Sequence, residues 1–122
     1  MQTVLVVDDE FGIGEVLEAI LTDEGYRVVT AINGHHALER LAGNRVDLIL
    51  SDLMMPVMDG ATLFKALRAD ERYRDIPFVL MCSLPETNIA DRIKGYTAFI
   101  HKPFRVDDVL DLVVKVLGRP NP

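Results

Sequence analysis

Five short runs of apolar residues, separated by stretches with a different pattern, constrain the fold of this chain more than any other feature. Within each run the apolar character is nearly continuous, which is typical of strands buried on both faces of a parallel sheet. Between most of the runs, apolar residues recur at the spacing of an amphipathic helix. The predicted strands cover residues 3–7, 26–32, 46–50, 76–82 and 97–101, and the predicted helices cover residues 11–24, 35–41, 61–70 and 106–117.

This alternation of strands and helices predicts an α/β fold. Parallel strands joined by right-handed helical crossovers form a sheet that is covered on both faces. We therefore expect a flavodoxin-like, doubly wound sheet of five parallel strands in the order 2-1-3-4-5. The length of 122 residues suggests one domain, predicted over residues 1–118, with residues 119–122 as a tail or the start of a linker.

Two connections between these elements carry weaker signals. Asn33-Gly34 is expected to form a turn before the second helix. Between the fourth and fifth strands, Thr87 or Asn88 is expected to cap a short helix in which Ile89 and Ile93 face inward.

The composition excludes several classes of protein. With 49% hydrophobic and 26% charged residues the chain is not intrinsically disordered, and its net charge of −6 argues against a nucleic-acid-binding surface. The single cysteine, Cys82, forms no internal disulfide and fits a reducing compartment. No apolar run approaches the ~20 residues of a membrane span, and no basic leader precedes the first strand. A cytoplasmic location without membrane contact is therefore expected.

Reactive polar side chains follow four of the predicted strands. They are Asp8 and Asp9 after the first, Asp52 after the third, Ser83 after the fourth and Lys102 after the fifth. In the order 2-1-3-4-5 these strands are adjacent, so the side chains converge at the carboxyl edge of the sheet. Three carboxylates repel one another unless a cation lies among them, and oxygen ligands suit Mg²⁺. The ammonium and hydroxyl groups complete a site for phosphoryl oxygens.

A simpler role remains open for each of these residues. Ser83 could cap a helix, Lys102 could be a surface charge, and Asp8-Asp9 could begin a helix. The adjacent histidines His35 and His36 point to different faces of a helix, which is poor geometry for a shared metal ion.

Four segments of the sequence resemble the receiver domains of two-component response regulators, of the chemotaxis-regulator type. They read Val-Val-Asp-Asp-Glu near the start, Ser-Asp-Leu-Met-Met-Pro-Val-Met-Asp-Gly in the middle, Met-Cys-Ser, and His-Lys-Pro-Phe near the end. Each segment alone is a weak signal, but their order and separation together are specific. The resemblance covers nearly the whole chain.

The resemblance implies a signalling switch in a phosphorelay, a phosphoacceptor domain and not an enzyme. Asp52 would take a phosphoryl group from a histidine kinase or a histidine phosphotransfer protein, and Ser83 and Lys102 would hold the phosphoryl oxygens. Ser83 would then move toward the phosphoryl group, which lets the ring of Phe99 swing inward. The Lys102-Pro103 bond is expected to be cis, as is usual in that family.

The resemblance also implies a set of ligands for Mg²⁺. Asp9 would bind the ion directly and Asp8 through water, with Asp52 and the backbone carbonyl of Met54 as further ligands. The Met54 side chain is in addition expected to influence the access of water that hydrolyses the phosphoryl group.

Two features depart from the pattern of that family. Leu84 follows Ser83, where receiver domains have a small residue, and its bulk is expected to crowd kinase or water access. Ser83 and Lys102 are 19 positions apart, which is shorter than in the family. The fourth helix is therefore expected to be about one turn shorter or irregular. Since that helix belongs to the family's dimer face, no oligomeric state is predicted. The sequence also does not identify a downstream target.

Three other functions remain as alternatives. A flavodoxin-like cofactor binder is disfavoured because the Asp-Asp-Glu turn after the first strand repels phosphate. A phosphatase with an aspartate nucleophile lacks the Asp-x-Asp pair after that strand. A protein-interaction module that is never phosphorylated is kept open by Leu84 and by the shortened segment.

Overall fold

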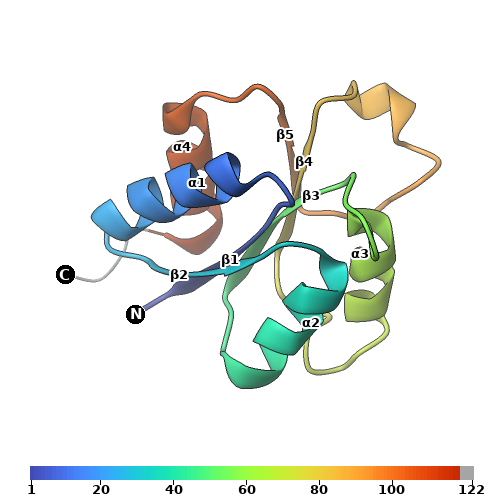
Figure 1. Cartoon of the computed structure of the whole chain (residues 1–122), viewed down its shortest axis with the longest axis horizontal. Helices are drawn as coiled ribbons and strands as arrows, with labels where there is room; N and C mark the ends of the chain where they lie inside the picture. Colours follow the sequence, from blue (N-terminus) through green and yellow to red (C-terminus); the bar gives the residue numbers. More distant parts are fainter. Residues whose placement is uncertain (119–122) are drawn as a thin grey trace.

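The centre of the molecule is a five-stranded parallel sheet. The computed structural model describes residues 1–118, and the predicted tail or linker at residues 119–122 lies outside them. The strand order is β2-β1-β3-β4-β5, as predicted (Figure 1). The strands are β1 (Thr3–Val7), β2 (Arg27–Ala31), β3 (Leu48–Asp52), β4 (Phe78–Cys82) and β5 (Ala98–His101).

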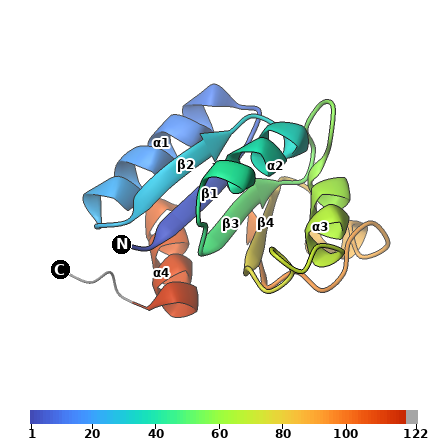
Figure 2. The same ribbon diagram turned by 90° about the horizontal axis from the view of Figure 1, so that it is seen from below.

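Helices cover both faces of the sheet (Figures 1 and 2). On one face lie α1 (Phe11–Asp23) and α4 (Val106–Leu117), and on the other lie α2 (Gly34–Gly43) and α3 (Gly60–Arg68). The flavodoxin-like α/β fold predicted from the sequence is thereby confirmed. Within residues 1–118, none of the helices has the length and apolar character needed to cross a membrane.

Two apolar cores hold the helices on the sheet, because alternate residues of each strand reach opposite faces. In β1, Leu5 packs into the core beneath α2 and α3, whereas Val6 packs into the core beneath α1 and α4. Every residue of β1, β3 and β4 is buried, which explains why these strands read as continuous apolar runs.

The register of the strands brings the carboxyl ends of four strands to the same edge of the sheet. Val7 pairs with Ser51, Asp52 with Met81, and Cys82 with His101, so β1, β3, β4 and β5 end at nearly the same level. The residues at and just after these strand ends therefore lie along one edge of the sheet.

The start of α2 differs from the prediction. Asn33 is the N-cap of this helix, and its side-chain oxygen accepts a hydrogen bond of 2.8 Å from the backbone N–H of His36. Gly34 is the first helical residue, so the predicted Asn33-Gly34 turn is wrong. The cap satisfies one of the unpaired N–H groups at the helix end, which favours starting the helix there.

The segment between β4 and β5 contains one short 3-10 turn, η1 (Glu86–Asn88), and no α-helix. The expected shortened or irregular fourth helix is thus confirmed. Ile89 and Ile93 are buried as predicted. Thr87 and Asn88 lie inside the turn and bond to each other, with the Thr87 hydroxyl 3.4 Å from Asn88 Oδ1. The prediction that one of them caps a helix is therefore wrong.

Candidate functional site

A buried lysine lies among carboxylates at the carboxyl edge of the sheet. Lys102 Nζ donates a hydrogen bond of 2.7 Å to Asp8 Oδ2, and it lies 3.4 Å from Asp52 Oδ2 and 3.6 Å from Glu10 Oε1. Asp8 is 4% exposed and Asp52 is 6% exposed. The structure therefore brings together Asp8, Asp52 and Lys102, which come from the ends of three strands.

Backbone hydrogen bonds fix two of these residues in place. The N–H of Asp8 donates to the Ala31 carbonyl at 3.0 Å, and the N–H of Lys102 donates to the Cys82 carbonyl at 2.9 Å. The Lys102-Pro103 bond is cis, as expected. The sheet therefore fixes the backbone of Lys102 and of Asp8, and their side chains meet in the hydrogen bond described above.

Gly60 lets the loop after β3 return against the end of that strand. Its N–H donates a 2.8 Å hydrogen bond to the carbonyl of Leu53. A Cβ atom on Gly60 would lie 2.3 Å from the carbonyl oxygen of Asp52, too close for any other residue. Next to it, Asp59 caps α3 by accepting a 2.8 Å hydrogen bond from the N–H of Thr62. This close return fixes the backbone that carries Asp52.

The electrostatic balance of the site is unfavourable to full ionisation. Burial raises the pKa of Asp52 from 3.8 to about 6, the charge of Lys102 opposes this shift, and the charge of Asp8 adds to it. Burial lowers the pKa of Lys102, but its hydrogen bond to Asp8 and the charges of Asp52, Asp8 and Glu10 outweigh burial and raise it. Lys102 is therefore charged at neutral pH, and one positive charge does not balance three carboxylates.

The carboxylate oxygens lie close enough together to share a metal ion. One oxygen from each of Asp8, Glu10 and Asp52 lies within 4.8 Å of the others. Opposite oxygens around an octahedral Mg²⁺ are about 4.2 Å apart, since each Mg–O distance is about 2.1 Å. Three hard oxygens that lie within 4.8 Å of one another need only a small adjustment to approach the same Mg²⁺ ion. The acidic cluster is therefore consistent with Mg²⁺.

The cluster differs from the predicted ligand set in one acidic residue. Glu10 belongs to it and was not among the predicted site residues, whereas Asp9 is exposed and lies outside it. The sequence signal for Glu10 is its place as the third acid of Asp8-Asp9-Glu10. Asp8 Oδ1 accepts a 2.9 Å hydrogen bond from the N–H of Glu10, and this local bend sets the direction of the Glu10 side chain.

The other predicted site residues surround the cluster. Ser83 is exposed and lines a shallow depression together with Lys102 and Glu10. Met54 is exposed on the loop after β3, where its sulfur lies 3.3 Å from Arg92 Nη1. Phe99 is half-buried on β5. Ser83 and Lys102 thus line one depression, Met54 lies on the loop after β3, and Phe99 lies on β5.

The acceptor loop, residues 53–59, connects Asp52 to α3 and has an unusual backbone at its tip. Val57 has a positive φ of 69° and its side chain is 84% exposed. A β-branched residue rarely adopts this left-handed conformation, because its side chain crowds the backbone. The tip of this loop is therefore strained and apolar.

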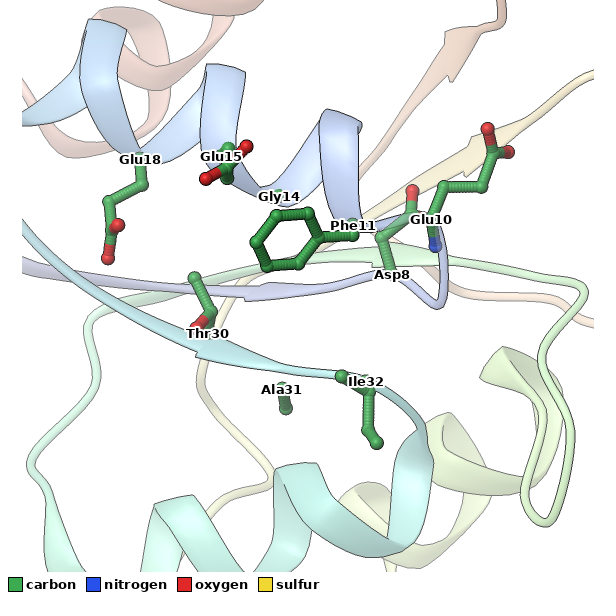
Figure 3. A pocket seen from close by; sticks show the side chains of 9 residues that line it. All are labelled: Asp8, Glu10, Phe11, Gly14, Glu15, Glu18, Thr30, Ala31 and Ile32. Atoms are coloured by element: carbon green, nitrogen blue, oxygen red, sulfur yellow. The ribbon is translucent and has the colours of Figure 1, made fainter.

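A hollow beside the site runs between α1 and β2 (Figure 3). It begins at Asp8 and Glu10, and the carboxylates of Glu15 and Glu18 on α1 line it farther along. The ring of Phe11 lies in the middle of the hollow, with Glu15 and Glu18 on one side of it and Asp8 and Glu10 on the other. These additional negative charges increase the attraction of the edge for a cation.

Comparison with known families matches the chain to the response regulator receiver domain over residues 4–114. The chain is 37% identical to response regulator Rre1 from Synechocystis, in an alignment that covers 96% of this chain and 52% of Rre1. It is 34% identical to sporulation initiation phosphotransferase F from Bacillus subtilis, covering 95% of this chain and 94% of that protein. The chain thus spans about half the length of the first relative and nearly all of the second.

Solved structures support the same grouping. Chemotaxis response regulator CheY4 of Vibrio cholerae is 34% identical with a TM-score of 0.89, covering 96% of this chain and 99% of that one. The receiver domain of sensor histidine kinase PA1611 from Pseudomonas aeruginosa is 28% identical with a TM-score of 0.87, covering 96% and 98%. That structure has a magnesium ion coordinated in its active site cleft.

Proposed function

The chain belongs to the family of response regulator receiver domains, and from that membership we propose that Asp52 accepts a phosphoryl group from a phosphorylated histidine of a partner protein. A receiver domain is a phosphoacceptor switch and not a conventional enzyme, since its own side chain is modified. Members are phosphorylated by histidine kinases or phosphotransferases. For this chain we propose a histidine kinase or a histidine phosphotransfer protein as the phosphodonor, and a cytoplasmic location.

One observation carries the assignment of Asp52. Its carboxylate is buried at the end of the central strand, with Lys102 Nζ at 3.4 Å and the Asp8 carboxylate in the same cluster. A structural ion pair would need one lysine and one carboxylate. A surplus of buried negative charge beside a single ammonium supports a site built to receive a cation and a phosphoryl group.

The transfer requires a nucleophile and positive charge around the phosphoryl oxygens. An oxygen of Asp52 forms the new bond to phosphorus, the P–N bond of phosphohistidine breaks, and its electron pair returns to the imidazole ring. Lys102 donates hydrogen bonds to the phosphoryl oxygens, and Ser83, which lines the same depression, donates another. Mg²⁺, when bound, neutralises charge shared by the carboxylates and the phosphoryl group. Positioning and charge neutralisation account for most of the catalysis of such transfers.

Asp8, Asp9 and Asp52, with the carbonyl oxygen of Met54, are proposed as the groups that hold the ion. Hard oxygen ligands with room for water suit Mg²⁺. Asp9 is exposed and adjoins Asp8 in the sequence, and in this proposal its side chain turns toward the ion when the ion binds. Glu10 is the neighbouring acid that takes part in the cluster described above.

The proposed switch couples Ser83 to Phe99. Phosphorylation favours a conformation in which the Ser83 hydroxyl contacts the new phosphoryl group, and the Phe99 ring then moves inward. The ring centroid of Phe99 lies 6.4 Å from those of Tyr96 and His101, so its movement would disturb both. Phe99 has no hydroxyl group, so a readout through an aromatic hydroxyl at this position is absent.

Intact-mass measurement after incubation with acetyl phosphate and Mg²⁺ tests this proposal. We expect one phosphoryl adduct on the natural protein and none on Asp52→Asn. Asp111→Asn, which removes an exposed carboxylate on α4, is the matched control and should keep the adduct. An adduct that persists in Asp52→Asn would overturn the assignment. Absence of an adduct with any small phosphodonor would instead favour an interaction module.

A further inference from the structure

We propose that a groove between α3 and the segment 89–95 binds an acidic segment of a partner protein that inserts one apolar side chain. The groove lies beside the connection between β4 and β5, which contains no α-helix. Figures 1 and 2 both show this segment, drawn in orange, running beside α3. The proposal concerns a surface away from the acidic cluster and does not depend on phosphorylation of Asp52.

The floor of this groove is apolar, and its large side chains are themselves mostly buried, with Phe64 6% and Ile93 4% exposed. It is formed by Ala61 and Phe64 of α3 and by Ile93 from the opposite wall. The Phe64 ring packs edge-on against Phe78 with a centroid distance of 5.0 Å, and the Arg68 guanidinium lies 4.5 Å from its centroid. With a volume of about 280 Å³, the groove has room for one or two side chains and not for a drug-sized ligand.

The rim of the groove is basic in a chain whose net charge is −6. Lys65, Arg92 and Lys94 line it, and all three are exposed. Asp91 is the one acid among the lining residues, so the rim carries a net charge of +2 within the described part of the chain. Cations concentrated around an apolar floor attract an acidic peptide that carries an apolar anchor.

Two of these cations are available to a ligand. In the salt bridges formed within residues 1–118, neither Lys65 nor Lys94 takes part. The third, Arg92, is oriented by the sulfur of Met54, 3.3 Å away. An arginine already held in position loses less conformational entropy on binding.

A nucleic acid fits this surface less well than a protein segment. The basic rim is short, and the remainder of the surface is acidic, which repels an extended polyanion. A short acidic segment contacts the rim alone. Its apolar side chain buries against Phe64 and Ile93, which a phosphate backbone does not.

Fluorescence anisotropy with a short labelled peptide, a central phenylalanine flanked by glutamates, tests the inference. We expect saturable binding that weakens at least about tenfold in the double variant Lys65→Glu/Lys94→Glu. Lys115→Glu on α4, which changes an exposed lysine on the other face of the sheet, is the matched control and should bind as the natural protein does. Binding should also weaken as salt is added.

Three results would overturn the inference. One is equal binding by the double variant and the Lys115 control. Another is equal affinity for a peptide in which alanine replaces the phenylalanine, because charge alone would then explain binding. The third is concentration-dependent self-association, measured by light scattering, that the double variant abolishes; a second copy of the chain would then be the occupant. Circular dichroism confirms that each variant is folded.

Discussion

At the scale of single residues, Asp52 combines burial with a surplus of negative charge. Its pKa of about 6 exceeds the ordinary 3.8, so the folded state takes up a proton more readily than the unfolded state. Between these two values the folded state binds more protons, and stability therefore falls as the pH rises. Ionised Asp52 is thus retained at a cost to stability, as is common at functional sites.

Asp52→Asn is therefore expected to stabilise the protein at neutral pH. The gain should be about 1–3 kcal/mol above pH 7, where the natural carboxylate is fully ionised, and should shrink as the pH falls from about 6 toward 4. Urea unfolding at several pH values without divalent ions measures it. Asp111→Asn, an exposed substitution, should give a small difference with no such pH dependence. A gain that is constant across this range would contradict the shifted pKa.

At the scale of elements, the close return of the acceptor loop to β3 depends on one glycine. Gly60 approaches the Asp52 carbonyl so closely that a methyl group has no room. Overlap with backbone atoms, unlike overlap with a flexible side chain, requires the strand end or the helix to shift.

Gly60→Ala should destabilise the protein by about 2–4 kcal/mol in urea unfolding, because backbone has to move. Gly12→Ala is the control: it lies in α1 with nothing near a new Cβ, and it should stabilise by about 0.5–1 kcal/mol. If both substitutions have the same sign, the close approach does not exist in solution.

How far the sequence predicts the structure also depends on the element. The strands and their order follow from continuous apolar runs and crossover rules, and these bring Asp8, Asp52 and Lys102 together. Glu10 was missed, because its direction depends on the hydrogen bond from its N–H to Asp8 and not on strand alternation. The caps at Asn33 and around Thr87 were misassigned, since the same residues favour turns and helix ends alike.

At the scale of the whole molecule, ion binding and folding are linked. An ion that binds only the folded state stabilises it, by about 2.7 kcal/mol at a concentration one hundred times its dissociation constant. The buried carboxylates make this linkage large, since the ion offsets repulsion that folding creates.

Mg²⁺ should therefore raise the melting temperature, and variants of the two candidate acids separate their roles. We expect Asp9→Asn to abolish most of the rise and Glu10→Gln to retain most of it, because Asp9 is the proposed direct ligand. Asp23→Asn, near the far end of α1, should leave the rise unchanged. If Glu10→Gln instead abolishes the rise and Asp9→Asn retains it, the ion binds to Asp8, Glu10 and Asp52 and not to Asp9.

The positive φ of Val57 bears on how readily the acceptor loop rearranges. A left-handed backbone raises the free energy of an L-residue by about 1–2 kcal/mol. Any alternative shape of the loop that returns Val57 to an extended conformation recovers that energy. Remodelling beside Asp52 is thereby favoured by roughly five- to thirtyfold in its equilibrium constant, before any phosphoryl group arrives.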